Sequence, residues 1–267
     1  ENHVPALRPF RPLQICSEFD DAIHKEVDFT VEARHMQRFK KNFKDDPEVY
    51  IPAVFREWTT RQVIVTERID GVKISNRQLL EERGLDVRRI ARNGTQSVLR
   101  QIFDHGYFHG DPHPGNIFVL DRNVICFVDF GIIGIVSPSV RNHLAAIVIG
   151  VVGRDPQKLI RTIQQLSQKT IDNVDQLEYD LMELIEEYAD IPLKDIDFTD
   201  VLNRFSSLFV TYRIRMIPGF YLLTKALVTM EGIGRRLDPD YNLVAELRPY
   251  AQKLIRRQFA PHQVLTD

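Results

Sequence analysis

The sequence predicts an α+β protein in which a small mixed part, ending near Asp70-Gly71, precedes a larger and mainly helical part. A charged stretch with apolar residues at helical spacing runs from Ser17 to Phe43, and two apolar runs typical of strands follow it at 50–55 and 62–66. From Pro138 onward the pattern is almost continuously helical. The length of 267 residues suits one large domain or two small ones.

The segment between these parts carries the least regular pattern. Asp86–His105 has the spacing of a helix, and residues 106–116 contain so many glycines and prolines that we expect a rigid loop with neither helix nor strand. Apolar runs at 117–120 and 124–128, separated by Asp121-Arg122-Asn123, predict a short β-hairpin directly after this loop.

The composition is that of an ordinary globular protein. Hydrophobic residues make up 43% and charged residues 27%, and 35 basic against 37 acidic side chains give a net charge of −2, so no overall field attracts nucleic acid. The two cysteines, Cys16 and Cys126, do not suggest a disulfide framework, which favours a reducing, cytoplasmic location. The uncharged apolar run Leu144–Gly153 is too short to span a membrane.

The strongest functional signal is the segment HGDPHPGN at 109–116, followed after the predicted hairpin by Asp129-Phe130-Gly131. Each segment alone is consistent with a turn. Together they follow the order of parts used for phosphoryl transfer, in which one carboxylate lies near the attacking hydroxyl and two oxygen ligands hold Mg²⁺. Asp111 suits the first role, and Asn116 and Asp129 suit the second, because Mg²⁺ prefers hard oxygen donors.

The two histidines of this loop have different expectations. No cysteine or third histidine is close in sequence, so a metal site made by His109 and His113 is a weak hypothesis. For His109 we expect a hydrogen bond to backbone near Asp129. For His113 a functional role and a scaffold role remain equally open.

A second group of acidic residues, Glu26, Asp28 and Glu32, lies on the first predicted helix. Asp28 and Glu32 are four residues apart and therefore share one helix face. A solvated acidic face is the ordinary interpretation of such a pattern. The alternative is functional, because kinases place a glutamate on the corresponding helix to pair the lysine that holds the α- and β-phosphates.

These motifs together resemble the UbiB/AarF family of atypical protein-kinase-like proteins, the ADCK group of eukaryotes. The Pro-His-Pro-Gly interior of the loop is the most specific element, and the resemblance extends from about Leu13 to about Ile255. It implies a protein-kinase-like fold, with a partial small N-lobe of helix C, antiparallel strands and hinge at 1–71, and a helical C-lobe with the catalytic loop and the Asp-Phe-Gly motif at 72–267.

The resemblance also implies roles for individual residues, with ATP and Mg²⁺ as cofactors. Glu32 would be the helix-C glutamate, whereas Glu26 and Asp28 would belong to the family's extra acidic motif at the nucleotide site. Backbone groups of Glu67 and Ile69 would line the adenine hinge. By the same resemblance, Asp111 would be the catalytic-loop aspartate, and Asn116 and Asp129 would be the metal ligands.

The sequence departs from the family pattern before Glu32. It contains no Lys-x-Gly-Gln motif, no phosphate loop and no strand with the phosphate lysine, so we expect it to represent the carboxy-terminal two-thirds of a member. We further expect weakened ATP binding and an exposed apolar patch near Phe29, Ala33 and Val65. After Gly131 a helix begins within about seven residues, which leaves no room for a peptide-docking segment and argues against a peptide substrate.

The function that the resemblance implies is an ATP-dependent accessory activity in ubiquinone biosynthesis. The expected partners are nucleotide, isoprenoid-quinone lipid intermediates and quinone-biosynthesis proteins, with no nucleic acid. The expected location is cytoplasmic, at the inner face of a bacterial membrane, with membrane contact through segments outside this sequence. Two alternatives stay open: a catalytically weak, pseudokinase-like nucleotide-binding scaffold, and a small-molecule phosphotransferase of the aminoglycoside-kinase kind.

Overall fold

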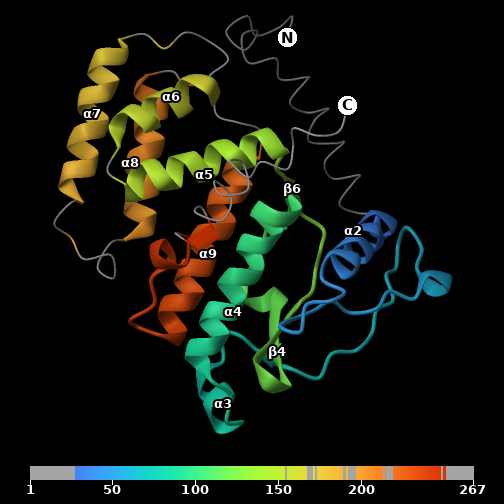
Figure 1. Ribbon diagram of the computed structural model, residues 1–267. Helices are drawn as coiled ribbons and strands as arrows, with labels where there is room; N and C mark the ends of the chain where they lie inside the picture. Colours follow the sequence, from blue (N-terminus) through green and yellow to red (C-terminus); the bar gives the residue numbers. More distant parts are fainter. Residues whose placement is uncertain are drawn as a thin grey trace, which may run out of the picture.

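The computed structural model describes residues 28–153, 155–166, 171, 173–188, 191, 197–212, 214, 219–247, 249 and 250. The expected helix start at Ser17 and the acidic residue Glu26 lie outside the described residues. In Figure 1, the mixed part and its strands lie on one side of the central helix α4 (Val87–Leu99), and most of the helices that follow residue 137 lie on the other.

The first described helix, α2 (Phe29–Asn42), begins directly after its N-cap residue, Asp28. The carboxylate of Asp28 accepts a hydrogen bond from the amide of Thr30 at 3.0 Å, which satisfies one of the free donors of the first turn. Lysines occupy the last turn, where positive charge is favourable. One face of the helix is buried against the small sheet and the Asp-Phe-Gly turn, as the helical spacing of its apolar residues predicts.

The predicted apolar patch on this helix is wrong. Ala33 is only 4% exposed, and Phe29 and Val65 are half-buried, because α2 packs its apolar face inward and the backbone amide of Phe29 bonds the carbonyl of Arg61. The large exposed apolar side chains of the small lobe are instead Trp58 and Val63.

The predicted hairpin is confirmed and forms the centre of a four-stranded sheet. Strands β4 (Ile117–Leu120) and β5 (Val124–Phe127) pair in antiparallel fashion around a 3₁₀ turn at Asp121–Asn123. The sheet order is β1-β5-β4-β2, in which β1 (Val49–Tyr50) pairs in parallel with β5 and β2 (Val72–Lys73) in antiparallel with β4.

The two predicted strands at 50–55 and 62–66 are less regular than expected. A single antiparallel bridge joins Val54 to Thr66, flanked by backbone hydrogen bonds from Phe55 to Val65 and from Glu67 to Ala53. A 3₁₀ turn at 56–58 occupies the place of continuous pairing. The proline at position 52 has no amide hydrogen to donate, which helps to end β1 after two residues.

The predicted helix at 86–105 is confirmed, with one change of geometry. α4 is capped by Asp86, whose carboxylate accepts from the amide of Arg89, and its continuation Arg100–His105 widens into a π-helical turn. Gly106, with φ +61°, ends the helix in the left-handed conformation that glycine adopts without strain.

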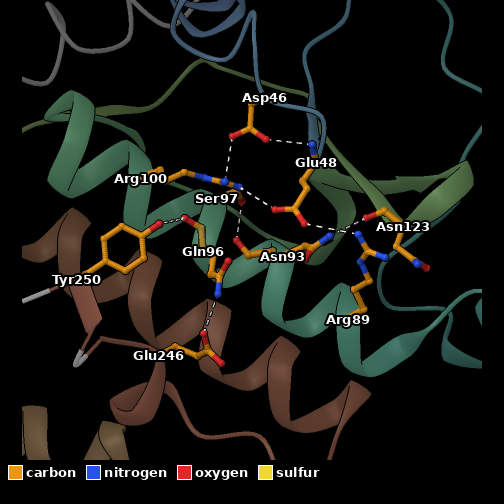
Figure 2. A network of polar contacts seen from close by, with 11 residues as sticks. Asp46, Glu48, Arg89, Asn93, Gln96, Ser97, Arg100, Asn123, Glu246 and Tyr250 are labelled. Carbon is orange, nitrogen blue, oxygen red and sulfur yellow. Dashed lines mark hydrogen bonds and ion pairs between the residues drawn. The ribbon is translucent and has the colours of Figure 1, made fainter. Parts of the chain in front are cut away.

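A network of polar contacts ties the loop after α2 to α4 (Figure 2). The Arg100 guanidinium lies 3.1 Å from the carboxylate of Asp46 and 3.6 Å from that of Glu48, and Arg89 lies 3.8 Å from the other oxygen of Glu48. Asp46 also accepts the backbone amide of Glu48. The small lobe is therefore fixed to the helical lobe at the end of the sheet that lies near α4.

The expectation of a loop without strands at 106–116 is wrong at both ends. Tyr107–His109 forms β3, which pairs in antiparallel fashion with β6 (Ile133–Ile135), and Pro114–Asn116 forms a 3₁₀ turn. The pairing joins residues about 25 positions apart, so the local abundance of glycine and proline could not reveal it. Gly134 is required there, because a side chain at this position would collide with the ring of Phe108.

The expected helical part is confirmed. Its elements are α3 (Arg77–Glu82), α5 (Pro138–Val152), α6 (Pro156–Leu166), α7 (Val174–Glu187), α8 (Phe198–Thr211) and α9 (Phe220–Leu237). α9 packs along α4 and joins the main core, whereas α6, α7 and α8 bury a second apolar cluster among themselves. In the part of the chain that the structure describes, none of the helices has the length and apolarity of a membrane span.

Candidate functional site

The loop that carries Asp111 is held by a buried histidine. His109 is 1% exposed, its Nε2 lies 3.2 Å from the carbonyl oxygen of Val128, and its Nδ1 accepts the backbone amide of Asp111 at 3.1 Å. The expected bond to backbone next to Asp129 is thus confirmed. Burial lowers the pKa of His109, so the ring stays neutral and donates from Nε2, which fixes both segments relative to one another.

The carboxylate of Asp111 pairs with a cation from the far end of the sequence. Lys225 on α9 places its Nζ 2.8 Å from Oδ1 of Asp111, and the two side chains are 35% and 32% exposed. Leu222, one turn earlier on α9, packs close to Gly110. Helix α9 therefore supplies a positive charge beside the loop that carries Asp111.

Sequence reasoning missed Lys225. Its only signal was that a single lysine interrupts the apolar pattern on the buried side of a helix, a place where a charge is rarely found without a partner. The partner lies 114 positions earlier, so no spacing rule could have named it.

His113 has a scaffold role in the structure. Its Nδ1 accepts the amide of Gly115 at 3.1 Å, and its carbonyl accepts the amide of Asn116. Because the amide of Val128 in turn donates to the carbonyl of Asn116, this turn fixes Asn116 beside the end of β5. The ring of His113 is exposed.

The structure brings Asn116 and Asp129 together. The side-chain amide of Asn116 lies 3.3 Å from Oδ2 of Asp129, and Oδ1 of Asp129 accepts the amide of Gly131 at 3.3 Å. Asp129 has φ +60°, a left-handed conformation that aspartate tolerates better than most residues but that still stores strain. An amide oxygen next to an exposed carboxylate is a donor set that fits Mg²⁺.

The glutamate of α2 also reaches this turn. Oε1 of Glu32 accepts the backbone amide of Phe130 at 2.9 Å, and Nδ1 of His35, one turn later, lies 2.8 Å from the carbonyl oxygen of Phe130. Burial raises the pKa of Glu32, the negative charge of Asp129 raises it further, and the Phe130 amide opposes them. His35 was not singled out by the sequence, because a lone histidine on a helix carries no signal of its partner.

The other acidic residue of the described helix, Asp28, serves the helix itself. Its carboxylate caps α2 through Thr30 and lies 3.2 Å from Nε of Arg61. The hydrogen bond from the Thr30 hydroxyl lowers the pKa of Asp28 below its usual range. Asp28 and Glu32 occupy successive turns as the spacing predicts, but their contacts lead to different segments.

Glu67 and Ile69, the residues predicted to lie at the adenine hinge, line an open groove of about 460 Å³ between the loop after α2, residues 67–70 and the tip of the β4–β5 hairpin. The groups of Glu67 are largely engaged: its amide donates to the carbonyl of Ala53, and its carboxylate accepts from the Tyr50 hydroxyl at 2.7 Å. The amide of Ala53 and the Tyr50 hydroxyl lower the pKa of Glu67. Ile69 is half-buried at the groove wall.

Comparison with known proteins places these features in a family. The model of the ABC1 atypical kinase-like domain matches residues 2–164, and that of the UbiB helical domain matches residues 181–242. Among solved structures, the erythromycin complex of Rv3197 from Mycobacterium tuberculosis shares the fold, with a TM-score of 0.53 and 19% identity over 90% of this chain and 61% of that one.

Curated relatives agree with this match. The protein is 34% identical over 90% of its length to the chloroplastic protein ACTIVITY OF BC1 COMPLEX KINASE 1 of Arabidopsis thaliana, and it covers 35% of that relative. It is 32% identical over 94% of its length to the probable protein kinase UbiB of Marinobacter nauticus, of which it covers 47%. The chain thus spans about a third to a half of these relatives, and it belongs to the ABC1/UbiB family of atypical kinase-like proteins.

Proposed function

We propose that this chain is the catalytic-loop and helical part of an atypical kinase or ATPase of the UbiB type, which uses ATP and Mg²⁺ and contributes to ubiquinone biosynthesis. The observation that carries the proposal is the contact between Asn116 and Asp129, at 3.3 Å, beside a loop in which Asp111 is paired with Lys225. The relatives named as probable protein kinases UbiB support the same function.

In this proposal, Asp111 is the carboxylate that orients the attacking hydroxyl or water. Lys225 pairs with Asp111 and presents its ammonium group to the phosphate oxygens, where a point charge suits the ligand. The neutral ring of His109 holds the Asp111 amide, so the carboxylate keeps its position while the phosphates bind.

Asn116 and Asp129 are the proposed ligands of Mg²⁺, which neutralises charge on the phosphates when it is bound. Before the metal binds, the Asn116 amide keeps the Asp129 carboxylate at the end of β5. The strained backbone at Asp129 is consistent with a functional position, because such conformations persist only where the surrounding contacts enforce them.

The remaining predicted residues complete the proposed nucleotide site. Glu32 would approach the phosphates from α2, with Glu26 and Asp28 as the acidic motif at the start of that helix. Glu67 and Ile69 would lie at the adenine hinge, with Ile69 as the better candidate, since the amide of Glu67 already has a partner. The proposed division is a partial N-lobe at 1–71 and a C-lobe at 72–267.

The short connection after the Asp-Phe-Gly turn supports a substrate other than a peptide. β6 follows it directly, and α5 begins at Pro138. We therefore propose that the acceptor is water or an isoprenoid-quinone intermediate. Because such intermediates are lipids, we propose that the protein acts at a membrane surface, on the cytoplasmic face in a bacterium. Its proposed partners there are other proteins of quinone biosynthesis.

Calorimetric titration with ATP, with and without Mg²⁺, tests the proposal on the wild type, Asp129→Asn and Asp45→Asn. We expect Mg²⁺ to raise the affinity of the wild type for ATP. In Asp129→Asn the affinity for ATP in the presence of Mg²⁺ should be at least about tenfold lower than in the wild type, because a neutral amide is a poorer metal ligand than a carboxylate. Asp45→Asn makes the same chemical change at an exposed position after α2 and should behave as the wild type.

Release of inorganic phosphate from ATP provides the activity readout for the same proteins. An unchanged effect of Mg²⁺ in Asp129→Asn would contradict the metal assignment. Binding of ATP by the wild type without any dependence on Mg²⁺ and without phosphate release would favour the scaffold alternative.

A further inference from the structure

Both backbone groups of Phe130 are held by the same helix. The amide of Phe130 donates to Glu32 at 2.9 Å, and the carbonyl of Phe130 lies 2.8 Å from Nδ1 of His35. Glu32 and His35 are three residues apart on α2 and so lie on neighbouring turns of one face. The two side chains are complementary, because an ionised carboxylate only accepts hydrogen bonds and an imidazole N–H donates one.

The side chain of Phe130 is fixed by the same face of α2. It is fully buried, with its ring centroid 4.7 Å from that of Phe39 and 5.2 Å from that of His109. Phe39 lies one turn beyond His35, so Glu32, His35 and Phe39 form a continuous stripe along the helix. The position of the Asp-Phe-Gly turn is therefore tied to the position of α2.

The two hydrogen bonds act on different peptide planes. The amide of Phe130 belongs to the plane shared with Asp129, and its carbonyl belongs to the plane shared with Gly131. Holding both planes fixes the backbone dihedral angles of Phe130. The first plane orients Asp129, and the second orients the Gly131 amide that donates to Oδ1 of Asp129.

We infer that His35 is a positioning residue for Asp129: its Nδ1–H holds the Phe130 carbonyl, and through this peptide it sets the direction of the proposed metal-binding carboxylate. The inference rests on the proposed function for what Asp129 binds, but the contact itself does not depend on it. Asp129 gains from such support, because its φ of +60° is a left-handed conformation that costs free energy even for aspartate, which tolerates it better than most residues.

His35 is itself held in place from the helical lobe. The rings of His35 and Tyr107 form an edge-to-face contact with their centroids 6.1 Å apart. The guanidinium of Arg38, one turn later on α2, lies over the same Tyr107 ring, 3.9 Å from its centroid. Tyr107 belongs to β3, the strand that leads into the catalytic loop. His35 therefore links α2, the Asp-Phe-Gly turn and the strand before Asp111.

Three substitutions of His35 separate the hydrogen bond from the bulk of the side chain. His35→Asn places its amide nitrogen the same number of bonds from Cα as Nδ1, and so keeps the donor. His35→Leu has nearly the shape of asparagine without a donor, and His35→Gln keeps a donor but moves it one bond farther out. Lys41→Leu, at an exposed position of the same helix, controls for a new apolar side chain.

Two readouts are measured on the full chain. The first is amide hydrogen exchange, followed by mass spectrometry, in a peptide that covers 127–133, without ligand. The second is the Mg²⁺ concentration at half of the thermal shift that ATP produces. A net hydrogen bond corresponds to about 3–10-fold in an equilibrium, so His35→Leu and His35→Gln should speed exchange and raise the Mg²⁺ requirement by about this factor. His35→Asn and Lys41→Leu should stay within about twofold of the wild type.

Equal behaviour of His35→Leu and His35→Asn in the exchange experiment would overturn the inference. If His35→Leu does not fold, the comparison of His35→Gln with His35→Asn decides in the same way. The exchange readout also tests the role of His35 separately from the proposed function. A wild type without any response to Mg²⁺ and ATP would contradict the proposed function, whereas the exchange of 127–133 would still show whether His35 holds the turn.

Discussion

Two acidic side chains of the candidate site, Asp111 and Glu32, have opposite electrostatic surroundings. Asp111, on the helical lobe, has the ammonium group of Lys225 at 2.8 Å. Glu32, on α2, is half-buried, bonds a backbone amide and has the negative charge of Asp129 as its principal charged neighbour. The protein itself neutralises the charge of Asp111 through Lys225. On the other side, a cation that binds near Glu32 and Asp129 would reduce the repulsion between their carboxylates.

This difference indicates how the site divides its tasks. The pair of Asp111 and Lys225 joins the loop at 109–116 to α9, so its geometry is set when the helical lobe folds. On the α2 side, the carboxylates of Glu32 and Asp129 repel each other, and a divalent cation or a lysine ammonium group between them would remove that repulsion. We therefore expect ligand binding to affect the α2 side more than the α9 side.

The largest expected effect concerns Lys225. Replacement by methionine nearly keeps the length of the side chain and removes its charge, which leaves Asp111 without this partner at the proposed phosphate site. Loss of a charge-assisted contact of about 1.5–3 kcal/mol predicts an affinity for Mg·ATP lower by about 10–100-fold in calorimetric titration. The pair is partly exposed, so the free energy of unfolding should change by less than about 1 kcal/mol.

Lys225→Arg is the matched control, because it keeps the charge at the end of a long side chain. It should retain most of the affinity, with some loss from the different shape of the guanidinium group. Equal affinity of Lys225→Met and the wild type for Mg·ATP would contradict this comparison, because the charge of Asp111 would then not need to be balanced by Lys225 for nucleotide to bind.

A smaller effect, with the opposite sign for stability, is expected at Glu32. Its pKa is raised in the folded state, so the charged form destabilises the fold above that pKa, and the penalty disappears as the pH falls toward the ordinary value of 4.5. Glu32→Gln keeps an acceptor for the Phe130 amide without the charge. We expect it to melt up to about 2 °C higher than the wild type at pH 7.

The gain of Glu32→Gln should shrink as the pH is lowered, because the wild-type carboxyl then becomes neutral as well. Thermal melts at several pH values between 4.5 and 8 measure this. Glu67→Gln provides the contrast, since the pKa of Glu67 is lowered and its charge stabilises the fold at neutral pH. A lower melting temperature of Glu32→Gln at pH 7 would show that the charge of Glu32 is already compensated.

The parts of the fold that could be predicted from the sequence depend on local patterns. The hairpin at 117–128 has two apolar runs on either side of a polar turn, and the helix from Asp86 has helical apolar spacing and a clear N-cap; both are confirmed. β3 could not be predicted, because its partner β6 lies beyond the hairpin and the glycine-rich surroundings indicate a loop. Tertiary pairing outweighs local preference at that point.

The candidate site shows the same division. Asn116 and Asp129 flank one hairpin, so their proximity follows from the sequence order of loop, two strands and turn. The contacts of His35 and Lys225 each join segments about 95 to 114 positions apart, and neither residue belongs to a motif. Only the packing of α2 and α9 against the loop reveals them.

The most direct test of the central claim, that Asn116 and Asp129 hold the divalent cation, uses Mn²⁺ as a paramagnetic probe in the presence of ADP. The side-chain amide signals of Asn116 and Asn123 are compared by nuclear magnetic resonance, because these asparagines stand at opposite ends of the β4–β5 hairpin. We expect substoichiometric Mn²⁺ to broaden the Asn116 signal much more strongly than that of Asn123, and Asp129→Asn to abolish this difference. Equal broadening of both signals, or selective broadening of Asn123, would contradict it.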